Sequence, residues 1–248
     1  VIQRMTGLAT LFLVCGTVCY IHGRMKQLRH QAGWKWILAG LLGCGSLAVL
    51  SKEIGFLLPI YLLVVESVFF RFQGPDKANR RRLLALFGVT LGLPLLALLV
   101  LFALSPGTLL DGYQFREFTL AERLLTEPRV LLWYLHMLVL PDTSQMGIYL
   151  DDIPISRSLL DPPSTLPAIL ILLGILAIGV TLRRKAPIAA FACLWFLAGH
   201  AMESTIIPLE IAFEHRNYLP GYGVLLAVAH TLLRTDLSPR TLRIRHAA

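Results

Sequence analysis

The sequence has few charged side chains for its length. Only 15% of its 248 residues are Asp, Glu, Lys or Arg, whereas 56% are hydrophobic and the mean hydropathy is +0.67. A soluble domain of this size would need an implausibly large core to bury so much apolar surface. The composition therefore predicts an integral membrane protein.

Several motifs of soluble enzymes and nucleic-acid-binding proteins are absent. The sequence contains no G-x-x-x-x-G-K-[ST] phosphate loop, no G-x-S-x-G elbow, no H-E-x-x-H pair and no zinc-type spacing. The net charge is +8, but the basic residues fall in short breaks between apolar runs. This distribution argues against nucleic acid as a partner and indicates that the charges set membrane topology.

Apolar runs of the length that a membrane span needs, about 20 residues, recur along the chain. The candidate spans are 3–21, 36–51, 54–70, 83–104, 166–182, 187–202 and 220–233. A further run, Pro128–Leu140, is shorter, contains His136 and ends before a proline, which favours an interfacial or re-entrant helix. We expect an all-α, polytopic bundle of about seven spans over residues 1–233, followed by a basic tail, 234–248. The chain opens on VIQRM without an initiator Met, so we expect it to be the C-terminal part of a larger membrane domain.

The basic breaks predict the sidedness of these spans. Four breaks, 22–35, 71–82, 183–185 and 234–248, hold sixteen of the 23 Lys and Arg residues. The positive-inside rule assigns all four to the cytoplasm, which requires that Pro128–Leu140 does not cross. Residues 51–53, 105–165 and 203–219 then face outward and hold twelve of the 15 acidic residues. In a bacterial inner membrane, the polar chemistry would therefore collect on the extracytoplasmic face.

The outer loop 105–165 is long for a connection and has helical patterns of its own. Thr119 and Glu122 have the spacing of a capping box, so we expect a helix to start there. Arg116, Arg123 and Arg129 are spaced through this region. We expect them on the surface, where they either meet lipid phosphates or form a solvated face.

The segment ESTIIPLEIAFEHRNYLP, residues 203–220, concentrates polar groups between two apolar runs. If it forms a helix after Pro208, then Glu210, Glu214 and Asn217 fall at i, i+4 and i+7 and share one face. A carboxylate there would act as acid or base, or orient a sugar, while His215 and Arg216 would hold a phosphate. Alternatively, these charges pair with other residues and tie two helices together. Function is favoured because ionisable groups near a bilayer are costly.

Other polar residues offer less specific signals. Lys52 and Glu53 form a turn that faces outward, and Lys52 either snorkels or adds positive charge to the same outer cavity. Glu66 lies inside an apolar run, where we expect a neighbouring helix or nearby water to satisfy it. A divalent metal is an open alternative rather than an expected cofactor. The residues that would contribute to it, with a further ligand, are Asp151, Asp152 and His200.

Three stretches resemble GT-C type polytopic glycosyltransferases, and specifically bacterial relatives of the tetratricopeptide-bearing transmembrane O-mannosyltransferases. They are LSKEIGFLLPIYLLVVE (50–66), LLTEPRVLLWYLHMLVLPDTSQMGIYLDDIP (124–154) and ESTIIPLEIAFEHRNYLP (203–220). The resemblance implies transfer of a sugar from a polyprenyl-phosphate donor to a protein or glycan acceptor on the outer face. It also implies that the catalytic acidic residue precedes this chain, and that Lys52, Glu53, Glu214, His215 and Arg216 serve the donor or its phosphate.

These observations define the candidate site and its alternatives. The candidate carboxylates for catalysis are Glu203, Glu210 and Glu214, and the expected partners are a lipid-linked sugar, an acceptor and membrane lipids. The candidate substrate- or phosphate-binding residues are Lys52, Glu53, Arg123, His215, Arg216, Asn217 and Tyr218. An O-antigen polymerase or ligase and a non-catalytic transporter or flippase stay open as alternatives. A transporter would be expected to show related halves with broken helices, and the sequence shows no such repeat.

Overall fold

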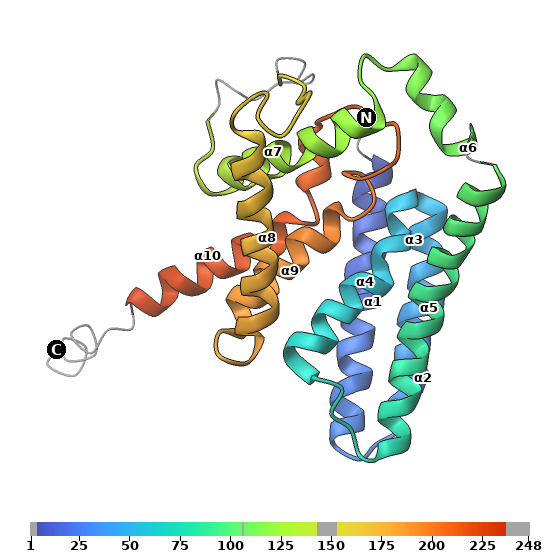
Figure 1. Ribbon diagram of the computed structural model, residues 1–248. Helices are drawn as coiled ribbons and strands as arrows, with labels where there is room; N and C mark the ends of the chain where they lie inside the picture. Colours follow the sequence, from blue (N-terminus) through green and yellow to red (C-terminus); the bar gives the residue numbers. More distant parts are fainter. Residues whose placement is uncertain (1–3, 106, 143–152, 237–248) are drawn as a thin grey trace, which may run out of the picture.

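A computed structural model describes residues 4–105, 107–142 and 153–236, and this part of the chain is all-helical (Figure 1). Helices contain 77% of the described residues, with no strand among them. The N-terminal half contains α1 (Arg4–Leu28), α2 (Trp34–Leu38), η1 (Ala39–Cys44), α3 (Gly45–Ser51), η2 (Glu53–Leu57), α4 (Leu58–Val65), η3 (Glu66–Phe70) and α5 (Lys77–Leu104). The second half contains α6 (Gly107–Leu110), η4 (Asp111–Phe115), α7 (Leu120–Val139), α8 (Thr165–Thr181), η6 (Leu182–Arg184), α9 (Pro187–His200), η7 (Glu214–Asn217) and α10 (Gly221–Asp236).

Five helical stretches in the described chain are long and apolar enough to cross a membrane. They are Arg4–Leu28, Trp34–Ser51, Glu53–Phe70, Lys77–Leu104 and Thr165–Arg184. The last two predicted spans form the shorter apolar helices Pro187–His200 and Gly221–Leu233. The helices Lys77–Leu104 and Thr165–Arg184 bury little of their surface in the protein, as expected for helices that face lipid. The prediction of a polytopic helical membrane protein therefore agrees with the fold.

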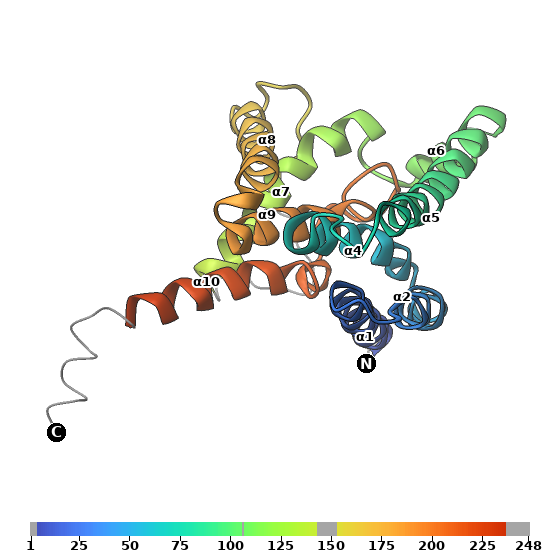
Figure 2. The ribbon, with the colours of Figure 1, turned by 90° about the horizontal axis from the view of Figure 1, so that it is seen from below.

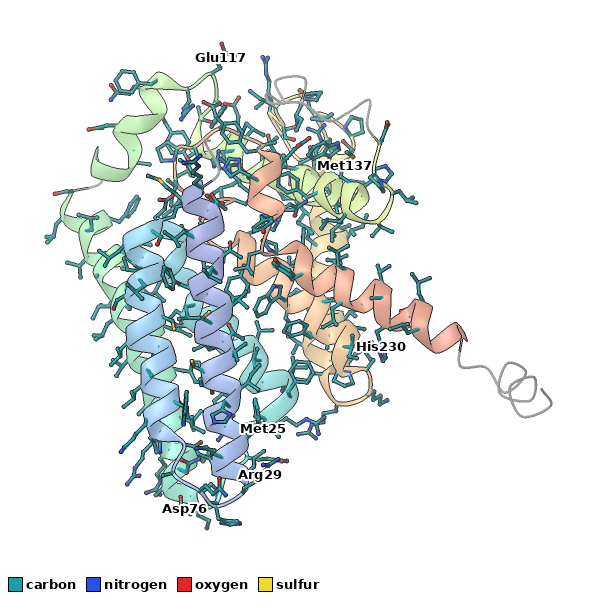
Figure 3. All side chains as sticks on the ribbon, turned by 180° about the vertical axis from the view of Figure 1, so that it is seen from behind. Met25, Arg29, Asp76, Glu117, Met137 and His230 are labelled. Atoms are coloured by element: carbon teal, nitrogen blue, oxygen red, sulfur yellow. The ribbon has the colours of Figure 1, made fainter. Side chains whose placement is uncertain are left out.

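The two ends of the bundle carry different segments. Met25, Arg29 and Asp76 lie at one end, where two of the basic breaks are found, and Glu117 and Met137 lie at the other (Figure 3). Helix α7 crosses the second end, beside the irregular segment that leads into η7 (Figure 1). Helix α10 runs obliquely away from the other helices in both ribbon views (Figures 1 and 2). The predicted Thr119–Glu122 capping box is confirmed, and the helix that it starts, α7, continues through Pro128 as a single 20-residue helix.

Glycines let the backbone of α1 pack closely against the next helical stretch, which consists of α2, η1 and α3. A Cβ atom added at Gly23 would lie 2.7 Å from the carbonyl oxygen of Gly33. One added at Gly40 would lie 2.6 Å from the carbonyl oxygen of Gly16. Small residues at helix contacts in a membrane permit this close backbone packing, which takes the place of a hydrophobic driving force. These contacts fix the N-terminal part of the bundle.

A buried ion pair joins α1 to η3 at the basic end. The Arg24 Nε donates to Glu66 Oε2 at 2.7 Å, Nη2 donates to Oε1 at 2.9 Å, and both side chains are 0% exposed. Tyr20 and the Phe72 amide also donate to the Glu66 carboxylate. Neighbouring elements therefore satisfy the Glu66 carboxylate, which confirms the first of the two alternatives given for it, a partner in the protein rather than nearby water.

We expect substitution of only one partner of the Arg24–Glu66 pair to lower stability strongly. Arg24→Met leaves a carboxylate buried without its cation, so the free energy of unfolding should fall by about 3–5 kcal/mol. The double variant Arg24→Met/Glu66→Leu should recover most of that loss, because no charge is then left unpaired. Denaturant unfolding in detergent micelles, followed by circular dichroism, measures both.

The exposed Arg81 provides the control, since Arg81→Met should leave stability within about 0.5 kcal/mol of the wild type. An Arg24→Met protein as stable as Arg81→Met would contradict a structural role for the pair.

Candidate functional site

The polar segment 203–217 is mostly irregular rather than helical. Helix α9 ends at His200, turns follow, and only Glu214–Asn217 form a short 3₁₀ helix, η7. Phe213, which precedes η7, has an extended backbone with φ −144° and ψ 131°. The predicted helical stripe of Glu210, Glu214 and Asn217 is therefore wrong. The physical reason is that side chains of α7 and η4 bind the backbone groups that an α-helix would have used internally.

Arg123 of α7 makes most of these backbone contacts. Its Nε donates to the Thr205 carbonyl at 3.0 Å and its Nη2 to the Glu203 carbonyl at 2.7 Å. Its Nη1 donates to the carbonyls of Leu209 and Glu210. The side chain is 0% exposed. The surface position predicted for Arg123 is therefore wrong, and its guanidinium is used to hold the segment rather than to meet a phosphate.

Other donors fix the rest of the segment. The Tyr134 hydroxyl accepts from the Phe213 amide at 2.7 Å and lies 2.9 Å from the Phe213 carbonyl. Arg116 donates from Nε to the Pro208 carbonyl and pairs with Glu210. Irregular backbone at a membrane protein's surface or interior persists only where its polar groups find partners in the protein or in water. Helix α7 therefore determines where Glu203, Glu214, His215 and Arg216 stand.

A small polar cavity lies between this segment and the tip of the N-terminal hairpin. Its volume is about 20 Å³, enough for one water molecule. Lys52 pairs there with Glu203, with Nζ 3.1 Å from Oε1. Residues that line the cavity include Lys52, Tyr61, Glu203, His215 and Arg216. Lys52 therefore lies beside Arg216 of the polar segment, which agrees with the alternative that it adds positive charge to this cavity. The side chain of Glu53 is 58% exposed.

A larger groove lies on the other side of His215. It has a volume of about 670 Å³ and a mainly apolar surface. Leu138 of α7 and Leu225 of α10 line it, together with Thr6 and Gly7 of α1. Glu214, His215, Asn217 and Tyr218 contribute its polar wall, and Tyr222 continues its aromatic lining. His215 also lines the small cavity. His215 and Thr6 therefore lie where an apolar groove meets a buried cluster that contains Lys52 and Arg216.

The electrostatics of the two sides differ. Burial lowers the pKa of His215, and the nearby charges of Lys52 and Arg216 lower it further, against the opposing effect of Glu203. The imidazole is therefore neutral at neutral pH. Arg216 is 5% exposed and donates from Nη1 to the Glu210 and Ile211 carbonyls. Its charge stays close to the groove, while its position is fixed by the backbone.

The candidate carboxylates occupy three different environments. Glu203 is buried and paired with Lys52, and Glu210 is exposed and paired with Arg116. Glu214 is exposed and lines the groove. Asn217 donates from Nδ2 to the Tyr134 carbonyl at 3.2 Å and also lines the groove. The structure thus brings Glu214, His215, Asn217 and Tyr218 together and leaves Glu210 outside.

Glu127 is a buried residue that sequence reasoning missed. It is 2% exposed, and its Oε1 lies 2.7 Å from Arg123 Nη2 one turn earlier on α7. Burial raises its pKa to about 7, although Arg123 and Arg216 oppose that rise. An Arg–Glu pair at i, i+4 within a largely apolar helix was the available signal.

Of the three metal candidates, His200 alone lies within the described residues. Asp151 and Asp152 lie outside the described residues. The His200 ring stacks on Tyr134 with centroids 5.3 Å apart and meets Phe196 edge-on. Within residues 4–105, 107–142 and 153–236, no three His, Cys, Asp or Glu side chains form a group that could hold a metal ion.

Comparisons with protein-family models, with curated proteins and with solved structures find no match to this chain. Its functional interpretation therefore depends on the geometry of the site and on the residues that form it.

We expect Arg123→Gln to loosen the polar segment, because a neutral amide cannot donate to four separate carbonyls. Hydrogen exchange of the backbone amides in 204–213 should speed up by about 10- to 100-fold, corresponding to the loss of two or three buried hydrogen bonds. Mass spectrometry of peptides from the exchanged protein measures this.

Arg129→Gln is the matched control on the same helix, because Arg129 contacts Pro154 and Ser156 instead. It should accelerate exchange near residues 153–157 and leave 204–213 unchanged. The same protection of 204–213 in both variants would rule out the anchoring role of Arg123.

Proposed function

We propose that the protein is a membrane glycosyltransferase of GT-C type, or part of one, that takes a sugar from a polyprenyl-phosphate donor. The observation that carries this proposal is that His215 lines both the groove and the small cavity. A groove of about 670 Å³ with an aromatic and aliphatic lining suits an alkyl chain, and it adjoins a buried cluster with two cations, Lys52 and Arg216. An amphiphile with an acidic headgroup fits this combination of apolar wall and positive charge.

The size of the cavity constrains where a phosphate would bind. At about 20 Å³, the space beside Lys52 and Arg216 holds a water molecule but no phosphate group. The phosphate would therefore sit on the groove side of His215, near Tyr218, with the two cations acting through their field. A neutral His215 imidazole would contribute one hydrogen bond to it.

Glu214 is the candidate carboxylate that faces the groove. Of the candidate carboxylates, Glu214 lines the groove beside Asn217, whereas Glu203 lines the small cavity. We propose that Glu214 orients the transferred sugar through its hydroxyl groups, or accepts the proton of the incoming acceptor. The resemblance of the chain to GT-C enzymes implies a further catalytic acid outside it, so Glu214 would act alongside that group.

The proposal includes the topology expected from the charges. The helices span a bacterial inner membrane about seven times, with 105–165 and 203–219 on the extracytoplasmic side and 234–248 in the cytoplasm. Its support is the distribution of segments in the bundle, because Arg29 and Asp76 lie at the opposite end from Glu117 (Figure 3). The acceptor, a protein or a glycan, would approach from the end that carries α7 and Glu117.

Paired substitutions of two glutamates test this function. In the full-length protein, Glu214→Gln should lower sugar transfer by about 100-fold or more, the usual contribution of a positioned acid or base. Glu210→Gln, four residues away and outside the groove, should change transfer by less than about threefold. Transfer of a radiolabelled sugar from a short-chain polyprenyl phosphate in proteoliposomes provides the assay.

Membrane insertion of both variants should match the wild type. Equal and full activity of Glu214→Gln and Glu210→Gln would reject the site. Movement of the labelled lipid across the bilayer without transfer of its sugar would favour the transporter alternative instead.

A further inference from the structure

Glu127 lies directly behind the cationic side of the proposed phosphate site. Its side chain leaves α7 toward the segment 203–217 and is 3% exposed. Besides the Arg123 ion pair, it interacts electrostatically with Arg216 and Glu203, both of which line the small cavity. A change in the charge of this carboxylate therefore changes the electrostatic potential next to the groove.

Charged and titratable groups face Glu127 from every element packed around it. Helix α7 contributes Arg123 and Tyr134, η4 contributes Tyr113, and the segment 203–217 contributes Glu203, Ser204 and Arg216. His200 at the end of α9 faces Arg216, and Lys52 pairs with Glu203. Lys52 also lies 3.9 Å from the exposed carboxylate of Glu53. Ionisation of Glu127 therefore lowers the positive charge of the cluster by one.

The geometry points to Glu127 as the residue that sets the charge of this cluster, and thereby how tightly the groove binds an anionic headgroup. This inference rests on the proposed function, because it concerns the same phosphate site. Glu127 touches neither the groove nor a substrate, so it acts through Arg216 and Lys52. It is a residue that tunes specificity for a charged headgroup over a neutral one.

The direction of the effect follows from the position of the proton. Because burial raises the pKa of Glu127 to about 7, the side chain is neutral below that pH and charged above it. The protonated form leaves the cations less compensated and strengthens anion binding. Two charges about 10 Å apart at an effective dielectric constant of about 20 change an affinity by roughly tenfold. By the same coupling, a bound anion raises the pKa of Glu127 and so favours its protonated form.

A purely structural role makes a different prediction. If Glu127 only positioned Arg123, then Glu127→Gln would keep an acceptor oxygen for that guanidinium and leave the pH profile of ligand binding unchanged. The pH profile therefore separates the two roles.

The test uses the full-length protein in neutral detergent and a radiolabelled probe, farnesyl methyl phosphate. As a phosphate diester, this probe keeps one negative charge between about pH 6 and pH 8, so its own titration does not contribute. The uncharged farnesyl methyl carbonate reports on the apolar groove alone. Burial lowers the pKa of His215 from its ordinary value, which reduces the contribution of its own titration in this range.

We expect the wild type to bind the phosphate about tenfold more tightly at pH 6 than at pH 8, with no pH effect on the carbonate. Glu127→Gln should bind the phosphate equally at both pH values, with the affinity of the wild type at pH 6. Glu127→Asp should restore the pH dependence. Glu117→Gln, which changes an exposed carboxylate in the bend before α7, should behave as the wild type does.

The outcomes separate the inference from the proposed function. If Glu127→Gln binds with the pH profile of the wild type, the role of Glu127 is rejected and the phosphate site stands. If the wild type binds the phosphate no better than the carbonate at any pH, the proposed phosphate site is rejected, and the role of Glu127 with it. Should Glu127→Gln fail to fold, a wild-type affinity that is constant from pH 6 to pH 8 would overturn the inference.

Discussion

The anchoring of an irregular backbone segment to α7 by Arg123 is the interaction on which the rest of the site depends. Between His200 and Glu214 the chain gives up helical hydrogen bonds next to a membrane, where unsatisfied carbonyls are costly. One guanidinium, itself held by Glu127, satisfies four of those carbonyls. Without this anchor, fewer contacts, among them those of Tyr134 and the Lys52–Glu203 pair, would position the side chains of 214–217 relative to the N-terminal hairpin.

This anchoring produces a site with two unlike sides that meet at His215. On one side, Lys52 and Arg216 are concentrated around a space for a single water molecule, and on the other lies a mainly apolar groove. A charged cluster that is buried but not fully neutralised attracts anions from a distance without offering a large binding cavity. Such an arrangement suits a ligand whose chain stays in the bilayer and whose headgroup reaches the protein's edge.

Features with a local physical cause were predictable from the sequence. The capping box at Thr119 and Glu122 and the helical, membrane-protein class follow from short-range spacing and composition. The polar segment was not predictable, because the partners that displace its helix, Arg123 and Tyr134, lie about 80 residues earlier in the chain. Arg123 was placed on the surface for the same reason: its pattern resembles that of a solvated arginine until its distant carbonyl acceptors are known. Lys52 lies beside His215 and Arg216 because the helices return the chain to the same end of the bundle.

Photolabelling tests the central claim, that the groove beside His215 binds the lipid phosphate, most directly. A polyprenyl phosphate with a diazirine near its headgroup would be irradiated with the full-length protein in membranes, and the adducts mapped by mass spectrometry. The account predicts adducts on 214–225, at Tyr218 or Tyr222, that disappear when excess unlabelled polyprenyl phosphate is added. Adducts spread evenly over the lipid-facing surfaces of α5 and α8, and unaffected by the competitor, would contradict it.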